Sequence, residues 1–130
     1  MKEKLKSLLP NAYIPITDFP VASIVVTNDG KEFNGVNVED ASTRAGFCAE
    51  RNAIGSAVAA GYKPFELKEI HVMISNGEIG TPCFVCRQLI SEFFSKDAKV
   101  YCYSINGDLK VYTVSELCPY PFDSEDLKWK

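Results

Sequence analysis

Three cysteines and one glutamate in this chain have the types and the spacing to bind a metal ion and to move a proton. Cys83 and Cys86 stand three residues apart in Pro-Cys-Phe-Val-Cys, so at the start of a helix both sulfurs lie on one side. Cys48 and Glu50 stand two residues apart in Cys-Ala-Glu-Arg, at the start of a second predicted helix. The positive ends of the two helix dipoles would favour the thiolate form of these cysteines, which is the form that binds metal.

The chemistry that fits this set is that of a catalytic zinc ion. Zinc with three protein ligands keeps a fourth position for water, and bound zinc lowers the pKa of that water from ~15.7 to about 7. Beside such a water, the Glu50 carboxylate could serve as a proton shuttle. Arg51 could offset the surplus negative charge of three thiolates on one zinc ion, and Arg87 is a second candidate for that role.

A structural zinc site and a redox site are the alternatives, because both also use Cys-x-x-Cys pairs. We expect a redox site to lack a third thiol and a nearby glutamate. A structural site needs a fourth ligand, and the candidates are Cys102, Cys118 and His71. Packing explains each more simply: Cys102 lies in a Val-Tyr-Cys-Tyr strand, Cys118 precedes a proline, and His71 alternates with apolar residues. The glutamate and the third thiol together therefore favour catalysis.

Length and composition predict a single globular domain over residues 1–130. The chain has 46% hydrophobic and 24% charged residues, as is usual for a globular protein. Its net charge is −3 and its 14 lysines and arginines are scattered, which argues against a nucleic acid as partner. No apolar stretch approaches the ~20 residues that span a bilayer, and the start of the chain does not resemble an export signal. We therefore expect a cytoplasmic, reducing location. Five cysteines cannot all pair within one chain, which also argues against a full disulfide framework.

Strands and helices alternate along the chain, which predicts a layered α/β domain with helices that cover a sheet. The strands are predicted at residues 21–27, 31–38, 70–75, 100–104 and 109–113. The helices are predicted at residues 2–9, 48–60 and 83–94. Ser115 is expected to cap one more short helical turn. The second helix carries small residues, with Ala49, Ala53 and Ala57 on one stripe, so we expect it to be central and tightly packed.

The cysteine motifs together resemble the signature of the zinc-dependent cytidine deaminases, in which ligand-x-Glu is followed by Pro-Cys-x-x-Cys. In this chain the signature reads Cys48-Ala49-Glu50 and Pro82-Cys83-Phe84-Val85-Cys86. A cysteine as the first ligand is similar to the small homotetrameric branch of that family. Further landmarks of the family match the segments at residues 13–21, 37–42, 86–88 and 115–122. The resemblance covers roughly residues 12–127.

This resemblance implies a three-layer α/β/α sandwich with a central mixed sheet of about five strands. It implies zinc held by Cys48, Cys83 and Cys86, with Glu50 as the residue that moves protons. The implied reaction is hydrolysis of cytidine and deoxycytidine to uridine and deoxyuridine with release of ammonia, a step of pyrimidine salvage. The implied assembly is a homotetramer with active sites at the subunit interfaces, and the implied partner is a small nucleoside.

The resemblance also assigns residues to the nucleoside. Asn37 and Glu39 match the ribose-binding segment, and on an extended chain their spacing turns both side chains to one face. Phe122 matches an aromatic residue that stacks on the pyrimidine from a neighbouring subunit. The remaining contacts are assigned to Phe19 in the pocket wall, to the backbone of Ala49, and to Thr81 in place of the usual serine before Pro-Cys.

Several residues depart from the pattern of the family without touching the metal ligands or Glu50. They are Ala22, Asp40, Thr43, Arg44, Phe84 and Val85. These differences bear on the shape of the pocket, so an aminonucleoside antibiotic such as blasticidin S is an alternative substrate. Asn37 and Glu39 favour an ordinary ribose instead. Editing of a base within RNA or DNA is a further alternative, and the net negative charge of the chain argues against it. A non-catalytic, structural zinc-binding interaction module is the alternative from a different class.

Overall fold

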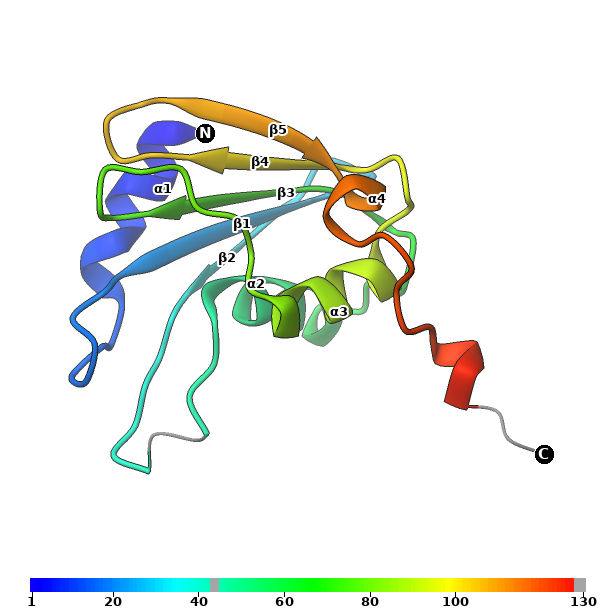
Figure 1. The fold of residues 1–130 in the computed structure, drawn as a ribbon, viewed down its shortest axis with the longest axis horizontal. Helices are drawn as coiled ribbons and strands as arrows, with labels where there is room; N and C mark the ends of the chain where they lie inside the picture. Colours follow the sequence, from blue (N-terminus) through cyan, green and yellow to red (C-terminus); the bar gives the residue numbers. More distant parts are fainter. Residues whose placement is uncertain (43–44, 128–130) are drawn as a thin grey trace.

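The fold is built on a mixed sheet of five strands (Figure 1). In a computed structural model that describes residues 1–42 and 45–127, the strands are β1 (Val21–Thr27), β2 (Glu32–Val36), β3 (Leu67–Ile74), β4 (Lys99–Tyr103) and β5 (Leu109–Thr113). Their order across the sheet is β2-β1-β3-β4-β5. The β3–β4 pair is parallel, and the other neighbours are antiparallel. The sequence departures at Thr43 and Arg44 lie outside the described residues.

Helices pack on both faces of this sheet. The helical segments are α1 (Lys2–Leu8), η1 (Leu9–Asn11), α2 (Ala49–Ala59), α3 (Phe84–Phe93), α4 (Val114–Leu117) and η2 (Ser124–Leu127). On one face, Leu5 of α1 joins Ile24 and Met73 of the sheet in one apolar cluster. On the other face, Ile54 of α2 and Ile90 of α3 belong to a larger cluster with the opposite sides of the same strands. The predicted three-layer α/β/α sandwich is therefore confirmed.

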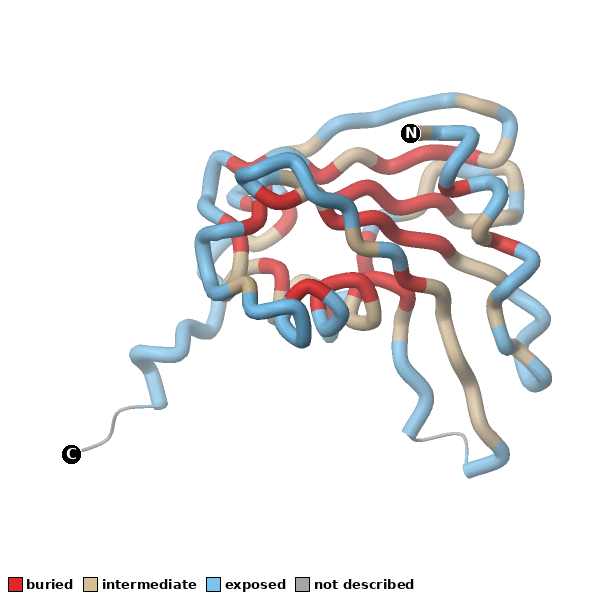
Figure 2. The backbone as a smooth tube through the Cα atoms, turned by 180° about the vertical axis from the view of Figure 1, so that it is seen from behind, coloured by how far each residue is buried: buried red, intermediate tan, exposed pale blue. Residues whose placement is uncertain are grey.

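The central strands are buried on both faces, which explains why their sequences are apolar runs. In β1, Ile24 belongs to the cluster beneath α1, while its neighbour Val25 belongs to the cluster beneath α2 and α3. Figure 2 shows the buried segments gathered in the strands and in the helical turns that face them. Within residues 1–42 and 45–127, no helix has the length and hydrophobicity needed to cross a bilayer.

The start of α2 lies very close to the sheet. Ala49, Ala53 and Ala57 are fully buried, which confirms the prediction of a tightly packed helix. Gly35 of β2 permits the approach, since a Cβ atom at that position would lie 2.2 Å from the carbonyl oxygen of Ala49. The backbone that leads into Glu50 is therefore fixed against the sheet.

Several predicted boundaries are displaced by one to three residues. Cys48 and Cys83 have extended backbone conformations and are the N-caps of α2 and α3, so each helix begins one residue later than predicted. β3 begins at Leu67, three residues before its predicted start at Ile70. The side chains of both cysteines thus lie at the positive end of a helix, as the spacing indicated.

The prediction that Ser115 caps the last helical turn is wrong. The cap is Thr113, whose Oγ1 accepts a hydrogen bond from the backbone N–H of Glu116 at 3.2 Å. Glu116 in turn accepts a hydrogen bond from the backbone N–H of Thr113 at 2.7 Å, which completes a capping box. Because β5 runs to Thr113 and α4 begins at Val114, Ser115 already lies inside the helix.

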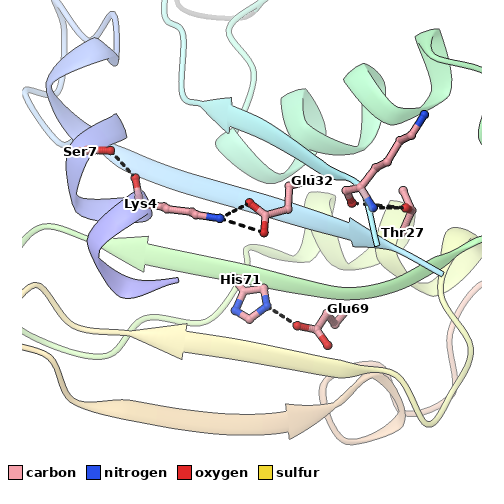
Figure 3. Close-up of polar contacts among 7 residues, drawn as sticks. Lys4, Ser7, Thr27, Glu32, Glu69 and His71 are labelled. Carbon is pink, nitrogen blue, oxygen red and sulfur yellow. Dashed lines mark hydrogen bonds and ion pairs between the residues drawn. The ribbon is translucent and has the colours of Figure 1, made fainter. Parts of the chain in front are cut away.

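Polar contacts on the α1 side of the sheet are shown in Figure 3. Lys4 of α1 and Glu32 of β2 form an exposed ion pair with an N···O distance of 2.9 Å, which contributes little to stability. His71 is buried on this face, and burial lowers its pKa, so the imidazole is neutral at pH 7. Its Nε2–H then donates to Glu69, and its Nδ1 accepts from the Tyr103 hydroxyl at 3.0 Å. His71 is therefore a satisfied structural histidine.

Candidate active site

The three motif cysteines meet where the first turns of α2 and α3 come together. The Sγ atoms of Cys48 and Cys83 are 3.6 Å apart, and those of Cys83 and Cys86 are 3.4 Å apart. All three sulfurs lie within 4.8 Å of one another. Within residues 1–42 and 45–127, no other group of three or more His, Cys, Asp or Glu side chains has this geometry. Cys102, Cys118 and His71 are not members of the cluster.

These separations fit one zinc ion. A tetrahedral site with Zn–S bonds of about 2.3 Å holds its sulfurs roughly 3.8 Å apart, close to the two separations found here. Cys86 is fully buried, Cys48 is half-buried and Cys83 is exposed, so the cluster is open to solvent on one side. Three protein ligands with an open side are the arrangement of a catalytic rather than a structural zinc site.

Hydrogen bonding among the thiols distributes their charge unevenly. The pKa of Cys48 is lowered to about 6, first by a hydrogen bond from Cys86, while burial opposes the shift. The pKa of Cys86 is raised, first by that same hydrogen bond and then by burial. Cys48 therefore carries negative charge more readily than Cys86. A divalent cation bound here would displace the remaining thiol protons, since zinc binds the thiolate.

Glu50 lies in the first turn of α2, next to the sulfurs. Its side chain is only 4% exposed, and burial raises its pKa to about 7, with a smaller contribution from the negative charge of Cys48. A carboxyl group that titrates near neutral pH can both accept and donate a proton under working conditions. The charge of Glu50 also contributes to the raised pKa of Cys86, so the carboxyl interacts electrostatically with more than one of the cysteines.

The two arginines considered as charge partners differ in their contacts. The Arg51 side chain donates to the carbonyl oxygen of Val85 at 3.1 Å, and its charge helps to lower the pKa of Cys48. The Arg87 side chain donates instead to oxygen atoms of three other residues. These are Pro82, Thr81 and Leu117. Arg51 thus acts on the thiolate charge, whereas Arg87 connects segments of the chain.

The segment with Asn37 and Glu39 lies beside the start of α2. Val38 pairs antiparallel with Phe47 in an isolated bridge, so the register places Asn37 opposite Cys48. Val38 also pairs in parallel with Tyr13, which adds a third extended segment. The residues assigned to the ribose are thereby next to the residues assigned to the metal.

Asn37 and Glu39 also hold the segment between Tyr13 and Val21 in place. The Asn37 amide accepts from the backbone N–H of Val21 at 2.9 Å and donates to the carbonyl oxygen of Phe19 at 2.8 Å. The Glu39 carboxylate accepts from two backbone N–H groups, at 3.0 and 3.1 Å, and from the Thr17 hydroxyl at 2.6 Å. The hydrogen bond from Thr17 lowers the pKa of Glu39, so this group is a carboxylate at neutral pH. The sequence contains no signal that identifies Thr17 as a partner of Glu39.

The other residues assigned to the nucleoside do not all come together within one chain. Phe19 is partly exposed, and Ala49 is the buried first residue of α2. Phe122 is 54% exposed and lines a groove between α3 and the segment after α4, together with Phe84 and Leu117. Neither the three cysteines nor Asn37 and Glu39 line that groove. The role of Phe122 in the site of a neighbouring subunit stays a prediction.

Comparisons with known proteins identify what this arrangement is similar to. A model of the cytidine and deoxycytidylate deaminase zinc-binding region matches residues 1–104. A cytidine deaminase of Sporosarcina psychrophila is 35% identical over 124 residues, which are 95% of this chain and 90% of that protein. A crystal structure of a cytidine deaminase from Burkholderia pseudomallei has a TM-score of 0.88 at 40% identity and covers 92% of this chain and 94% of that one. A blasticidin-S deaminase of Bacillus cereus is 32% identical over 111 residues, 78% of this chain and 76% of that protein.

Proposed function

Because the chain belongs to the zinc-binding family of cytidine and deoxycytidylate deaminases, we propose that it hydrolyses cytidine and deoxycytidine to uridine and deoxyuridine with release of ammonia. The observation that carries this proposal is the buried Glu50 carboxyl beside three converging cysteine sulfurs. Release of ammonia from a panel of cytosine compounds is the experiment that tests it.

Each residue of the cluster has a defined task in this reaction. Cys48, Cys83 and Cys86 would hold zinc, which when bound acts as a Lewis acid that activates water. Glu50 accepts a proton from the water that attacks C4 of the pyrimidine and passes it to ring N3. Glu50 then takes the remaining proton from the new C4 hydroxyl and delivers it to the departing amine, so that the C4–N bond breaks and the C4 carbonyl of the uracil ring forms. A pKa near 7 suits a group that must alternate between both roles.

Recognition of the sugar follows from the hydrogen bonds that Asn37 and Glu39 have left to make. A carboxylate offers about four acceptor positions, and the described residues occupy three at Glu39. An amide NH₂ offers two donors, and Asn37 uses one for Phe19. One donor therefore remains on Asn37, and one acceptor position remains on each of the two side chains, which matches a hydroxyl group that donates to Glu39 and accepts from Asn37. This supports a ribose or deoxyribose as the sugar.

Glu39→Gln should lower kcat/KM for cytidine about 10- to 100-fold, mainly through a higher KM. The reason is that a hydrogen bond to a charged group contributes about 1.5–3 kcal/mol, and 1.4 kcal/mol corresponds to tenfold. Steady-state kinetics with zinc content determined on the same samples would measure this. Thr17→Ser, which keeps the hydroxyl that contacts Glu39, is the matched control and should remain near the wild type. An unchanged KM in Glu39→Gln would show that Glu39 does not bind the sugar.

Blasticidin S is the second candidate substrate, because a blasticidin-S deaminase is among the similar proteins. The donor left on Asn37 and the acceptor left on Glu39 favour a nucleoside hydroxyl instead. A structural zinc module is less well supported, because within the described residues no fourth His, Cys, Asp or Glu joins the three cysteines.

We further propose a homotetramer with active sites at the subunit interfaces, acting in pyrimidine salvage in the cytoplasm. Large apolar side chains exposed near the site support an assembly, among them Phe84 at 77%, Val85 at 62% and Phe122 at 54%. All five cysteines are free thiols, which fits a reducing compartment. Analytical ultracentrifugation tests the assembly, and a monomer with full activity would refute both the tetramer and the role of Phe122 in a neighbouring site.

A further inference from the structure

Arg87 of α3 makes contacts in three directions with its guanidinium group. Its Nε donates to the carbonyl oxygen of Pro82 at 2.7 Å, and one Nη donates to the Thr81 hydroxyl at 2.7 Å. The other Nη donates to the carbonyl oxygen of Leu117 at 3.0 Å. The guanidinium carbon lies 4.3 Å from the centre of the Phe84 ring. These contacts use the rigid, planar set of donors that distinguishes arginine from lysine.

One end of this arrangement is the segment that carries a metal ligand. Residues 75–82 lead from β3 to α3 and contain neither helix nor strand, so no regular ladder fixes them. Thr81 and Pro82 directly precede Cys83, the exposed member of the sulfur cluster. Cys86 is fully buried and already fixed by α3. Cys83 is joined to α3 through its carbonyl oxygen, which accepts from the backbone N–H of Arg87 at 2.9 Å, and the path of the chain into this cap depends on what holds Thr81 and Pro82.

The other end is the segment that follows α4. Leu117 is the last residue of α4, and the chain beyond it runs past α3 and away from the sheet (Figure 1). The next residue on α3, Gln88, donates to the carbonyl oxygen of Phe122 at 2.7 Å. The Cys118 thiol donates to the carbonyl oxygen of Arg87 at 3.5 Å. Arg87 thus lies between the ligand segment and the segment that carries Phe122.

We propose that Arg87 is a positioning residue that fastens the Cys83 segment and the segment at residues 117–122 to the first turn of α3. It keeps the exposed ligand in register with the buried one, and it does so through the directions of its hydrogen bonds rather than through its positive charge. This inference rests on the proposed zinc site, and it does not depend on which nucleoside is the substrate.

The test compares Arg87→Lys with Arg87→Gln in the zinc-loaded protein, using the rate at which a chelating dye takes up the metal. Lysine keeps the charge but cannot reproduce three hydrogen bonds in fixed directions. We expect both variants to release zinc about 10- to 100-fold faster, because loss of contacts just outside a metal's ligands typically lowers the metal affinity by that factor. If Arg87→Lys retained zinc like the wild type while Arg87→Gln lost it, the role would be one of charge. Zinc release at the wild-type rate from both variants would show that Arg87 has no part in holding the metal ligands.

Two controls separate positioning from general loss of stability. Ile70→Val trims the same apolar core without touching the Arg87 contacts, and it should lower the melting temperature without faster zinc release. The absorption spectrum of the Co²⁺-substituted protein should change in Arg87→Lys and not in Ile70→Val, because it reports the geometry of the ligands. Equal changes in both variants would attribute the effect to stability alone.

The connection to the C-terminal segment has its own measurement. Chymotrypsin cleavage after the exposed Phe122 should be faster in Arg87→Lys than in the wild type, with zinc bound in both. Unchanged cleavage would show that Arg87 holds the ligand segment alone and would overturn the link to residues 117–122. A wild-type protein that binds zinc but leaves cytidine intact would contradict the proposed substrate while leaving this inference standing.

Discussion

Glu50→Gln should keep its zinc and lose at least about a hundredfold in kcat. General acid–base catalysis typically contributes 10²–10⁴-fold, and glutamine can neither take a proton from water nor deliver one to N3 or to the amine. Glu50 is not one of the three clustered sulfur ligands, so its replacement should leave the metal in place. The substitution is close to isosteric, and it removes a carboxyl whose pKa burial raises to about 7, so folding should not suffer.

The measurement is kcat for cytidine together with zinc per chain on the same preparation. Glu3→Gln is the matched control, because Glu3 is exposed on α1, on the opposite side of the sheet, and this variant should be indistinguishable from the wild type. Near-wild-type turnover in Glu50→Gln would show that another group moves the protons. Loss of zinc in Glu50→Gln would mean that the carboxyl contributes to binding the metal.

Cys86→Ser should lose the metal itself and with it the activity. Cys86 is fully buried between α3 and the sheet, so a serine hydroxyl at this position could not form hydrogen bonds with solvent. A serine hydroxyl stays protonated at neutral pH and is a poor zinc ligand, whereas a thiolate is a strong one. Two sulfurs would remain of the three that converge here.

Zinc per chain by atomic absorption after desalting checks this, with a value near one expected for the wild type and near zero for Cys86→Ser. Cys102→Ala provides the control, because Cys102 is also fully buried but lies outside the sulfur cluster. It should retain zinc and lose only some thermal stability. Stoichiometric zinc in Cys86→Ser would show that the ligand set is not the one assigned.

The sulfur cluster could be predicted from the sequence because its determinants are local. A Cys-x-x-Cys pair at a helix start converges on one point through helix geometry alone, and Cys48 stands at the start of the only other long helix predicted after the first strand. Apolar runs and turn residues are also local signals, and they predicted all five strands, although β3 begins three residues earlier than predicted. The small side chains of Ala49, Ala53 and Ala57 indicated the close approach that Gly35 allows.

The contacts missed from the sequence are those between segments far apart in the chain. Thr17 reaches Glu39 only because Tyr13 and Val38 pair in an isolated bridge that has no periodic signal. Arg87 reaches Leu117, thirty residues away, because α4 packs against α3 although β4 and β5 lie between them in the sequence. The wrong prediction at Ser115 concerns a local motif. Thr113 and Glu116 form the capping box, and their spacing of three residues in the sequence is the signal of that motif.

Ammonia release from four compounds tests the central claim most directly. Purified, zinc-loaded protein is incubated with cytidine, deoxycytidine, cytosine and blasticidin S, with Glu50→Gln in parallel as the blank. We predict zinc-dependent release of ammonia from cytidine and deoxycytidine, and none from either compound in the variant. Cytosine should release little ammonia, because it lacks the sugar that Asn37 and Glu39 are placed to bind. Release from blasticidin S alone, or from none of the four by a protein with zinc bound, would contradict it.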